Sequence, residues 1–129
     1  MSGRIGLFKK DENIKKPTRY YSDKQEKSIA KDLGGKQTPN SGATMWVKGD
    51  INIGNDWLIE AKTKTTHTNS FTIKKEWLEK NLNESIFMHK KHNALAFNFG
   101  PEEPNYYVID EDLFKTLIEH LKNYKEDMD

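Results

Sequence analysis

Residues 48–64 read KGDINIGNDWLIEAKTK, and this stretch decides the fold. It holds two short runs of strand-forming residues, 48–52 and 57–64, on either side of a Gly-Asn-Asp sequence that is typical of a tight turn. The stretch therefore predicts a β-hairpin. Because side chains alternate between the two faces of a strand, Leu58, Glu60 and Lys62 share one face of the second run.

Three charged side chains are expected to converge on one face of this hairpin. Pairing of the two strands can place Asp50 beside Glu60, with Lys62 farther along the same face. Two adjacent carboxylates repel each other unless a cation lies between them, and oxygen-only ligation suits Mg²⁺. A lysine beside that cation can orient or deprotonate a water, or stabilise charge that develops on a phosphate. The alternative is an exposed Glu–Lys pair on a solvated strand.

A helix with an acidic residue on its buried side is predicted before the hairpin. The sequence Ser22–Gln25 has the form of a capping box, which predicts a helix from about Asp23 to Leu33 that ends at Gly34-Gly35. Glu26 lies on the same side as an apolar stripe formed by Ile29, Ala30 and Leu33. A buried carboxylate is unfavourable unless it is paired or near a metal, and the alternative is a surface acid.

The polar loop at residues 36–44, KQTPNSGAT, contains groups that can donate to phosphate, among them Lys36 and Ser41. With this loop, the region from about Ser22 to Lys80 resembles the PD-(D/E)XK nuclease superfamily. Glu60-Ala61-Lys62 matches the (D/E)XK half of the motif, and Gly49-Asp50 stands where the family has Pro-Asp. The Ser41-Gly42 pair is similar to a loop of archaeal and phage Holliday-junction resolvases.

The resemblance implies a site and a chemistry. Lys62 would position or activate the attacking water and steady the phosphate during DNA hydrolysis. The helix after the hairpin would supply a basic residue, which we assign to Lys75. The implied ligands of one or two Mg²⁺ ions, with Mn²⁺ as an alternative, are Asp50, Glu60, Glu26 and the main-chain carbonyl of Ala61.

That next helix is predicted from about Ile73 to Met88, with Thr72 as its cap. Lys74 and Lys75 fall in its first turn, where cations interact unfavourably with the helix dipole, and this points to phosphate binding. Its apolar stripe, expected in the core, consists of Trp77, Leu78, Leu82 and Ile86.

Two strands and a last helix complete the predicted fold. Residues 94–99 and 106–109 are expected to pair antiparallel, and Asp110 is expected to cap a helix from Glu111 to about Tyr124. The side chains expected to face inward on that helix are Leu113, Phe114, Leu117, Ile118 and Leu121.

The predicted order is helix, three-stranded meander, helix, strand, strand, helix. This order predicts an α+β fold with a mixed sheet flanked by helices. The resemblance implies a restriction-endonuclease-like αβββαβ core, with the strand that carries Glu60 at the centre and an extra strand and helix at the end. We expect one domain at residues 19–125, after a flexible basic arm at 1–18 and before a frayed tail at 126–129.

Composition limits the possible classes of protein. The 129 residues are 34% hydrophobic and 32% charged, with no cysteine, which excludes disulfides and thiolate zinc sites. No apolar run approaches the length of a membrane span, and we expect a cytoplasmic protein, in the host cytoplasm if a phage encodes it. The net charge of +1 is unevenly distributed, with basic residues gathered at 1–19 and acidic residues at 110–129.

These features together favour a metal-dependent endodeoxyribonuclease of the phage Holliday-junction resolvase type, acting on branched DNA. Two symmetric cuts require a C₂ homodimer. One alternative is a nuclease for flaps, single strands or duplexes. Another is an inactive nuclease-fold module that binds DNA or protein, and a third is a charged scaffold with an accidental motif. The residues expected to contact DNA are Arg19, Lys36, Ser41, Lys48, Lys64, Lys74 and Lys75.

Overall fold

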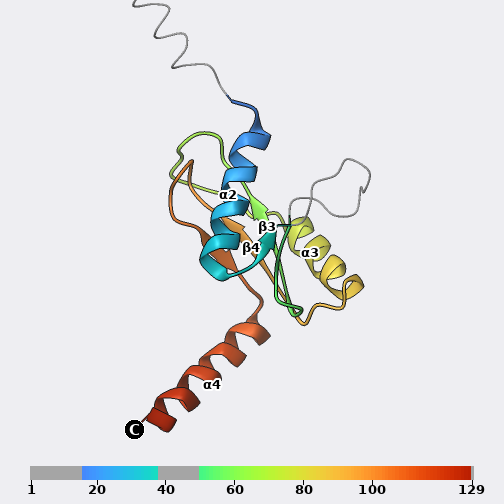
Figure 1. Cartoon of the computed structure of the whole chain (residues 1–129), viewed down its shortest axis with the longest axis vertical. Coiled ribbons are helices and arrows are strands. Elements are labelled where there is room, and N and C mark those ends of the chain that lie inside the picture. Colours follow the sequence, from blue (N-terminus) through green and yellow to red (C-terminus); the bar gives the residue numbers. More distant parts are fainter. Residues whose placement is uncertain (1–15, 38–49, 129) are drawn as a thin grey trace, which may run out of the picture.

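The structure is a computed structural model that describes residues 16–37 and 50–128. Figure 1 shows α2 and α3 beside the strands, and α4 extending away from them. The arrangement is α+β, a mixed sheet flanked by helices, as predicted. In chain order the elements are α2 (Thr18–Leu33), β1 (Lys36–Gln37), β2 (Asp50–Ile53), β3 (Trp57–Lys62), α3 (Lys75–Phe87), β4 (His92–Phe97), β5 (Tyr106–Val108) and α4 (Glu111–Met128).

The five strands form one sheet in the order β1-β2-β3-β4-β5, so β3 lies at the centre. All neighbouring strands are antiparallel except β3 and β4, which are parallel and are joined through α3. The parallel register aligns Trp57 with His92 and Lys62 with Phe97, and it explains why β4 begins at His92 rather than at the predicted Ala94. The predicted central position of β3 is confirmed.

The hairpin of β2 and β3 has the predicted form. Ile53 pairs with Trp57 at the turn, and Gly54 adopts a positive φ of 56°, a conformation that glycine reaches without strain. The turn is tied to the chain after α3, since the main-chain N–H of His92 donates to the carbonyl of Asp56 at 2.8 Å. This fixes the hairpin in its register.

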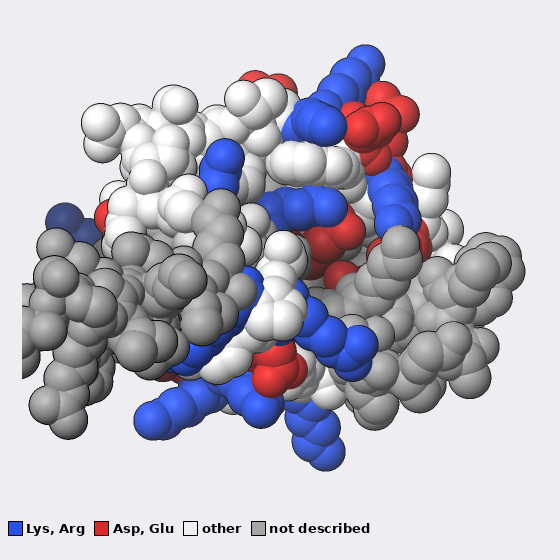
Figure 2. Space-filling view, turned by 90° about the horizontal axis from the view of Figure 1, so that it is seen from above, with Lys and Arg blue, Asp and Glu red and all other residues white. Residues whose placement is uncertain are grey.

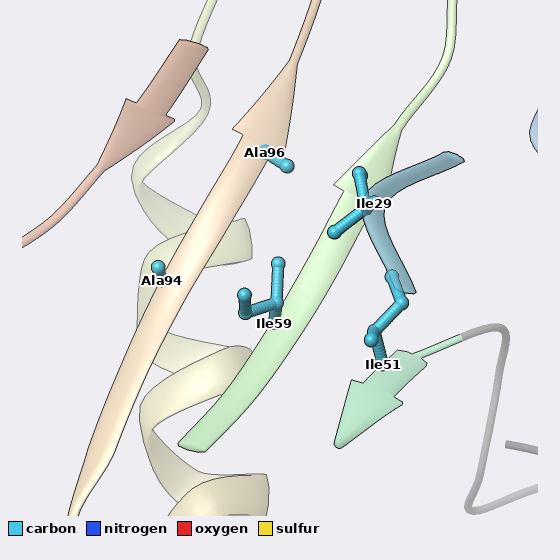
Figure 3. Packing of buried hydrophobic residues seen from close by; sticks show 5 residues of the cluster. All are labelled: Ile29, Ile51, Ile59, Ala94 and Ala96. Atoms are coloured by element: carbon cyan, nitrogen blue, oxygen red, sulfur yellow. The ribbon is translucent and has the colours of Figure 1, made fainter. Parts of the chain in front are cut away.

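The core lies between α2 and one face of the sheet. Ile29 of α2 packs against Ile51, Ile59, Ala94 and Ala96, and Figure 3 shows their side chains meeting on that face. Full burial of an isoleucine side chain contributes roughly 1.5–3 kcal/mol. The opposite face of the sheet, which α3 covers, buries Leu58 and Leu95, and it also carries the charged side chains of β2 and β3.

The predicted capping box of α2 is wrong. The helix begins at Thr18, with Pro17 as the N-cap residue, and Ser22 lies inside it, donating its hydroxyl to the carbonyl of Arg19 at 3.1 Å. Pro17 favours this earlier start because its fixed φ and missing N–H suit the beginning of a helix. The predicted end is confirmed, because Gly34 caps the helix with a φ of 69°.

The predicted polar loop after α2 contains a short strand. Residues 36–37 form β1, which pairs with Asn52 and Ile51 of β2 at the edge of the sheet. Gly35 allows this approach, since a Cβ there would lie 2.8 Å from the carbonyl oxygen of Asn52. Pairing with β2 thus gives strand conformation to residues whose composition is typical of a loop.

The apolar stripe predicted for α3 is confirmed at its beginning, where Trp77 and Leu78 are half-buried, and is wrong toward its end. The helix begins at Lys75, with Lys74 rather than Thr72 at its N-cap, and it buries Asn81 and Ser85. Leu82 and Ile86 are exposed. The reason is that Asn81 donates its amide to the carbonyl of Ala94 in β4 at 3.0 Å, which turns a polar side of the helix toward the sheet.

Helix α4 begins as predicted, because Asp110 accepts a hydrogen bond from the N–H of Leu113 at 2.8 Å. It continues to Met128 rather than ending near Tyr124, since no glycine or proline interrupts it. Among the described residues of α4, only Leu113 is buried, so the predicted inward packing is confirmed for Leu113 alone. The other four predicted core residues are exposed, namely Phe114, Leu117, Ile118 and Leu121.

Candidate active site

The site begins with a cross-strand pair of carboxylates. Asp50 of β2 lies directly opposite Glu60 of β3, so both side chains are on the same face of the sheet. They retain only 2% and 7% of their accessible surface. Lys62 follows on the same face, with its Nζ 3.7 Å from Oε1 of Glu60. The predicted convergence of these three side chains is therefore present.

Several buried carboxylate oxygens of this region lack a hydrogen-bond partner within the described chain. They are Oδ1 of Asp50, Oε2 of Glu60 and Oε1 of Glu26. A buried carboxylate oxygen without a donor is unfavourable, and a cation is the partner that satisfies it best.

Burial raises the pKa of all three carboxyls. The pKa of Asp50 rises to about 8, first through burial, then through the negative charges of Glu60 and Glu84. Burial also raises the pKa of Glu60, although the nearby Lys62 opposes the shift. The pKa of Glu26 rises to about 7 through burial, opposed by a hydrogen bond from Gln37. In the metal-free protein these three carboxyl groups therefore ionise at a higher pH than ordinary carboxyl groups do.

Glu26 lies close enough to Asp50 for its charge to contribute to the raised pKa of that residue. It is buried on α2, as the sequence predicts, and the nearby Gln37 of β1 opposes the rise of its pKa. The side chain of Ala61 packs against the apolar core, on the face opposite Glu60. A role for its main-chain carbonyl as a ligand stays a prediction.

Sequence reasoning missed Glu84 of α3. This residue forms a hydrogen bond with Asp50 and raises its pKa, and its charge also acts on Glu60. Its carboxylate lies 3.9 Å from Nζ of Lys80. The spacing of the sequence offered a signal for Glu84, because it lies seven residues, or two helical turns, after Trp77 and so on the same side of the helix. The prediction instead placed the side with Leu82 toward the core.

The described carboxylates suit a hydrated Mg²⁺ ion in their chemistry. Within residues 16–37 and 50–128, no three histidine or carboxylate side chains are already arranged as a metal-binding cluster. Mg²⁺ usually keeps several waters and needs only one or two carboxylates, which Asp50 and Glu60 can provide. Their unpartnered oxygens support this fit.

A tryptophan of α3 holds the site lysine in place. Nζ of Lys62 lies 4.4 Å from the ring centre of Trp77, and Nζ of Lys74 lies 5.6 Å from the same ring. Figure 2, which views the end of the molecule opposite α4, shows acidic side chains with lysine or arginine side chains around them. The beginning of α3 therefore brings positive charge next to Lys62.

The other residues expected to contact DNA are distributed around this end. Arg19 and Lys36 are exposed on α2 and β1, whereas Lys75 pairs with Glu79 at 3.8 Å on the exposed side of α3. Ser41 and Lys48 lie outside the described residues. Lys75 thus forms its ion pair within α3. Lys74, the N-cap residue of α3, lies over the ring of Trp77, as Lys62 does.

A cavity of about 460 Å³ adjoins the carboxyl end of β3. The charged residues in its lining are Lys16, Lys24, Lys64, Glu102 and Glu103, and Lys24 forms an ion pair with Glu102. Gln25 lies at its base, where it accepts a hydrogen bond from Thr63 at 2.5 Å and donates one to Asn105 at 3.1 Å. The cavity therefore combines cationic and acidic groups with amides that are hydrogen-bonded to their neighbours.

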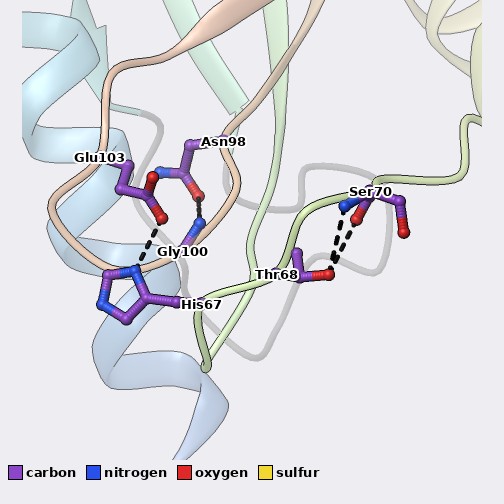
Figure 4. A network of polar contacts seen from close by, with 6 residues as sticks. All are labelled: His67, Thr68, Ser70, Asn98, Gly100 and Glu103. Atoms are coloured by element: carbon purple, nitrogen blue, oxygen red, sulfur yellow. Dashed lines mark hydrogen bonds and ion pairs between the residues drawn. The ribbon is translucent and has the colours of Figure 1, made fainter.

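Polar contacts order the loops around this cavity, as Figure 4 shows. Nδ1 of His67 lies 2.7 Å from the carboxylate of Glu103, and the N–H of Gly100 donates to Asn98 at 3.3 Å. A Cβ at Gly100 would lie 2.6 Å from Nδ1 of His67, so the two loops meet where a larger residue would not fit. These contacts tie Asn98 and Glu103 of the cavity lining to neighbouring residues.

Comparison with protein-family models, with curated proteins and with solved structures finds no match. None of the helices in the described parts of the chain is long and apolar enough to cross a membrane.

Proposed function

We propose that this protein is a metal-dependent endodeoxyribonuclease that acts on branched DNA, in the manner of a Holliday-junction resolvase. One observation carries the proposal. The cross-strand pair Asp50 and Glu60 has buried oxygens without partners, and Lys62 lies on the same face. Two carboxylates and a lysine around one point are suited to hydrolysis of a phosphodiester.

In this proposal each side chain has a defined part. Asp50 and Glu60 would hold Mg²⁺ or Mn²⁺, with Glu26 close behind Asp50. The bound ion would supply Lewis acidity and make a coordinated water more acidic. Lys62, kept in place by Trp77, orients the attacking water and stabilises negative charge on the phosphate. Glu84 lies close enough to Asp50 for its negative charge to act on that carboxyl.

The proposed DNA path follows the lysines beside the site. Lys74 shares a tryptophan with Lys62, and Lys64 lines the cavity at the end of β3. Contacts of this kind neutralise phosphates and give a salt-dependent affinity without sequence preference. A nuclease that recognises the shape of its substrate requires this type of surface.

The test is a cleavage assay on a labelled four-way DNA junction and a duplex of equal length. Each substrate is incubated with Mg²⁺, with Mn²⁺ or with a chelator. We expect paired, metal-dependent nicks in the junction alone. Asp50→Ala should abolish cleavage, and Lys62→Ala should lower the rate by about 10²–10³-fold. Lys31→Ala is the matched control, because it removes an exposed lysine of α2 outside the site.

Each of the other possible results of this assay would indicate a different function. Cleavage of junction and duplex at equal rates would leave a nuclease without junction specificity. Binding of DNA with no cleavage in either metal would indicate an inactive binding module. If neither binding nor cleavage is found, the proposal fails and the motif is an accidental feature of a charged scaffold.

A further inference from the structure

Helix α4 exposes a continuous row of large apolar side chains. Phe114, Leu117, Leu121, Tyr124 and Met128 are between 37% and 70% exposed. They recur at alternating steps of three and four residues, which is the spacing of a coiled-coil seam. We call these five residues, with the adjacent Ile118, the α4 stripe. Exposed apolar patches of this size usually mark an interaction surface.

The α4 stripe continues into an apolar groove on the sheet. Leu117 shares this groove, about 350 Å³ in volume, with the end of α2, with the sheet face that packs against α2 and with the residue after β5. The lining residues from these parts include Leu33, Ile53, Trp57, Tyr107 and Ile109. The stripe and the groove therefore form one surface.

The area of this surface is sufficient for a protein interface. Covering the six side chains of the α4 stripe would bury on the order of 600 Å² per copy, against about 800 Å² per partner in a standard interface. The groove beside Leu117 can supply the remainder.

The charges of α4 argue against a membrane or DNA as the occupant. Residues 111–128 contain five acidic and three basic side chains, a net charge of −2 with histidine neutral. Anionic lipids and DNA phosphates both attract basic helices and repel this one. These charges favour an apolar protein surface over a membrane or DNA.

Two copies of α4 complement each other when they run antiparallel. Alignment of the seams places Phe114 opposite Tyr124 of the second copy, and Leu117 opposite Leu121 of the second copy. The same alignment places Glu111 across from Lys125 of the second copy, twice by symmetry. A parallel pair would instead place His120 beside Lys125 of the second copy, which gives no attraction.

We propose that α4 is the homodimer interface of this protein, formed by antiparallel packing of the α4 stripes of two copies. The pairing is isologous, so it closes as a C₂ dimer. It locates the dimer surface, which sequence reasoning left open. It does not depend on nuclease activity.

The first experiment measures the mass of the full chain by light scattering at tens of micromolar. The wild type should be a dimer, and Leu121→Glu should be a monomer with an unchanged circular dichroism spectrum. Tyr124→Lys should give the same loss. Phe87→Glu is the matched control, because Phe87 is 82% exposed on α3, away from the stripe, and this variant should remain a dimer.

Two charge variants and two cysteine variants test the direction of the helices. Glu111→Lys should weaken dimerisation, and Glu111→Lys with Lys125→Glu should restore it. The chain has no cysteine, so single cysteines report on proximity. Ile118→Cys, near the symmetry axis, should cross-link between copies with a short bismaleimide. Met128→Cys should not, because in an antiparallel pair the two residues 128 are separated by roughly 27 Å.

Three results would overturn the proposal. The first is a monomeric wild type, whether or not it binds vesicles of phosphatidylcholine and phosphatidylserine. The second is a Leu121→Glu variant that remains a dimer. The third is a cross-link through Met128→Cys together with no rescue by the double charge reversal, which would require a parallel pair.

Discussion

Asp50→Asn should make the metal-free protein more stable at pH 8. Asp50 is almost fully buried and its pKa is raised to about 8, from an ordinary value of 3.8, by burial and by the charges of Glu60 and Glu84. In the unfolded chain the same carboxyl ionises near its ordinary pKa. The native state therefore retains a proton that the unfolded state has already released.

The sign of the pH dependence follows from this difference. Between about pH 4 and pH 8 the native protein binds more protons than the unfolded chain, so the free energy of unfolding falls as pH rises. A gap of about four pKa units at 1.36 kcal/mol each sets an upper limit of about 5 kcal/mol for Asp50 at pH 8. The raised pKa values of Glu26 and Glu60 act in the same direction.

The assay is urea unfolding in chelator at pH 5 and pH 8. The wild type should be less stable at pH 8 than at pH 5, and Asp50→Asn should reduce that difference and gain about 2–5 kcal/mol at pH 8. Glu119→Gln, which removes an exposed acid of α4, should leave the pH difference unchanged.

Addition of Mg²⁺ extends this test to the proposed site. A ligand present at 100 times its Kd stabilises the native state by about 2.7 kcal/mol. The wild type should gain stability at pH 8 with Mg²⁺, and Asp50→Asn should not. An Asp50→Asn variant no more stable than the wild type at pH 8, or equal wild-type stability at both pH values, would refute the reasoning.

Other predictions concern single residues. Ile59→Ala should lower the free energy of unfolding by about 2–5 kcal/mol in urea, because it leaves a cavity in the core. Gly35→Ala should destabilise by about 1–3 kcal/mol in the same assay, since its Cβ would lie 2.8 Å from the carbonyl of Asn52, and no loss would contradict the close packing. Asp110→Ala should cost about 1 kcal/mol and reduce helical ellipticity, because α4 loses its cap. Glu84→Gln should lower the pKa of Asp50, measured by carboxyl NMR titration, and an unchanged pKa would place the two side chains apart.

The acidic pair links stability to the proposed function. Ionised Asp50 and Glu60 would destabilise the metal-free fold, and the same repulsion would favour a bound cation. A buried acidic pair on β2 and β3 therefore lowers the stability of the metal-free protein at high pH.

Local sequence alone determined the hairpin and its charged face. A tight turn and a side-chain period of two leave few registers, so the convergence of Asp50, Glu60 and Lys62 could be predicted before any tertiary contact was known. The end of α2 at Gly34 and the cap of α4 at Asp110 could also be predicted from residues close together in the sequence. These features depend on residues close together in the chain.

The tertiary structure decided which helical faces are covered. Apolar periodicity favoured Leu82 and Ile86 as the inner face of α3, but the bond from Asn81 to β4 turned that helix and brought Glu84 to Asp50. The same periodicity identified four residues of the α4 stripe, namely Phe114, Leu117, Ile118 and Leu121, and could not say that they stay exposed. A sequence pattern shows that a face is apolar, whereas the surface that covers it depends on contacts between distant segments or between chains.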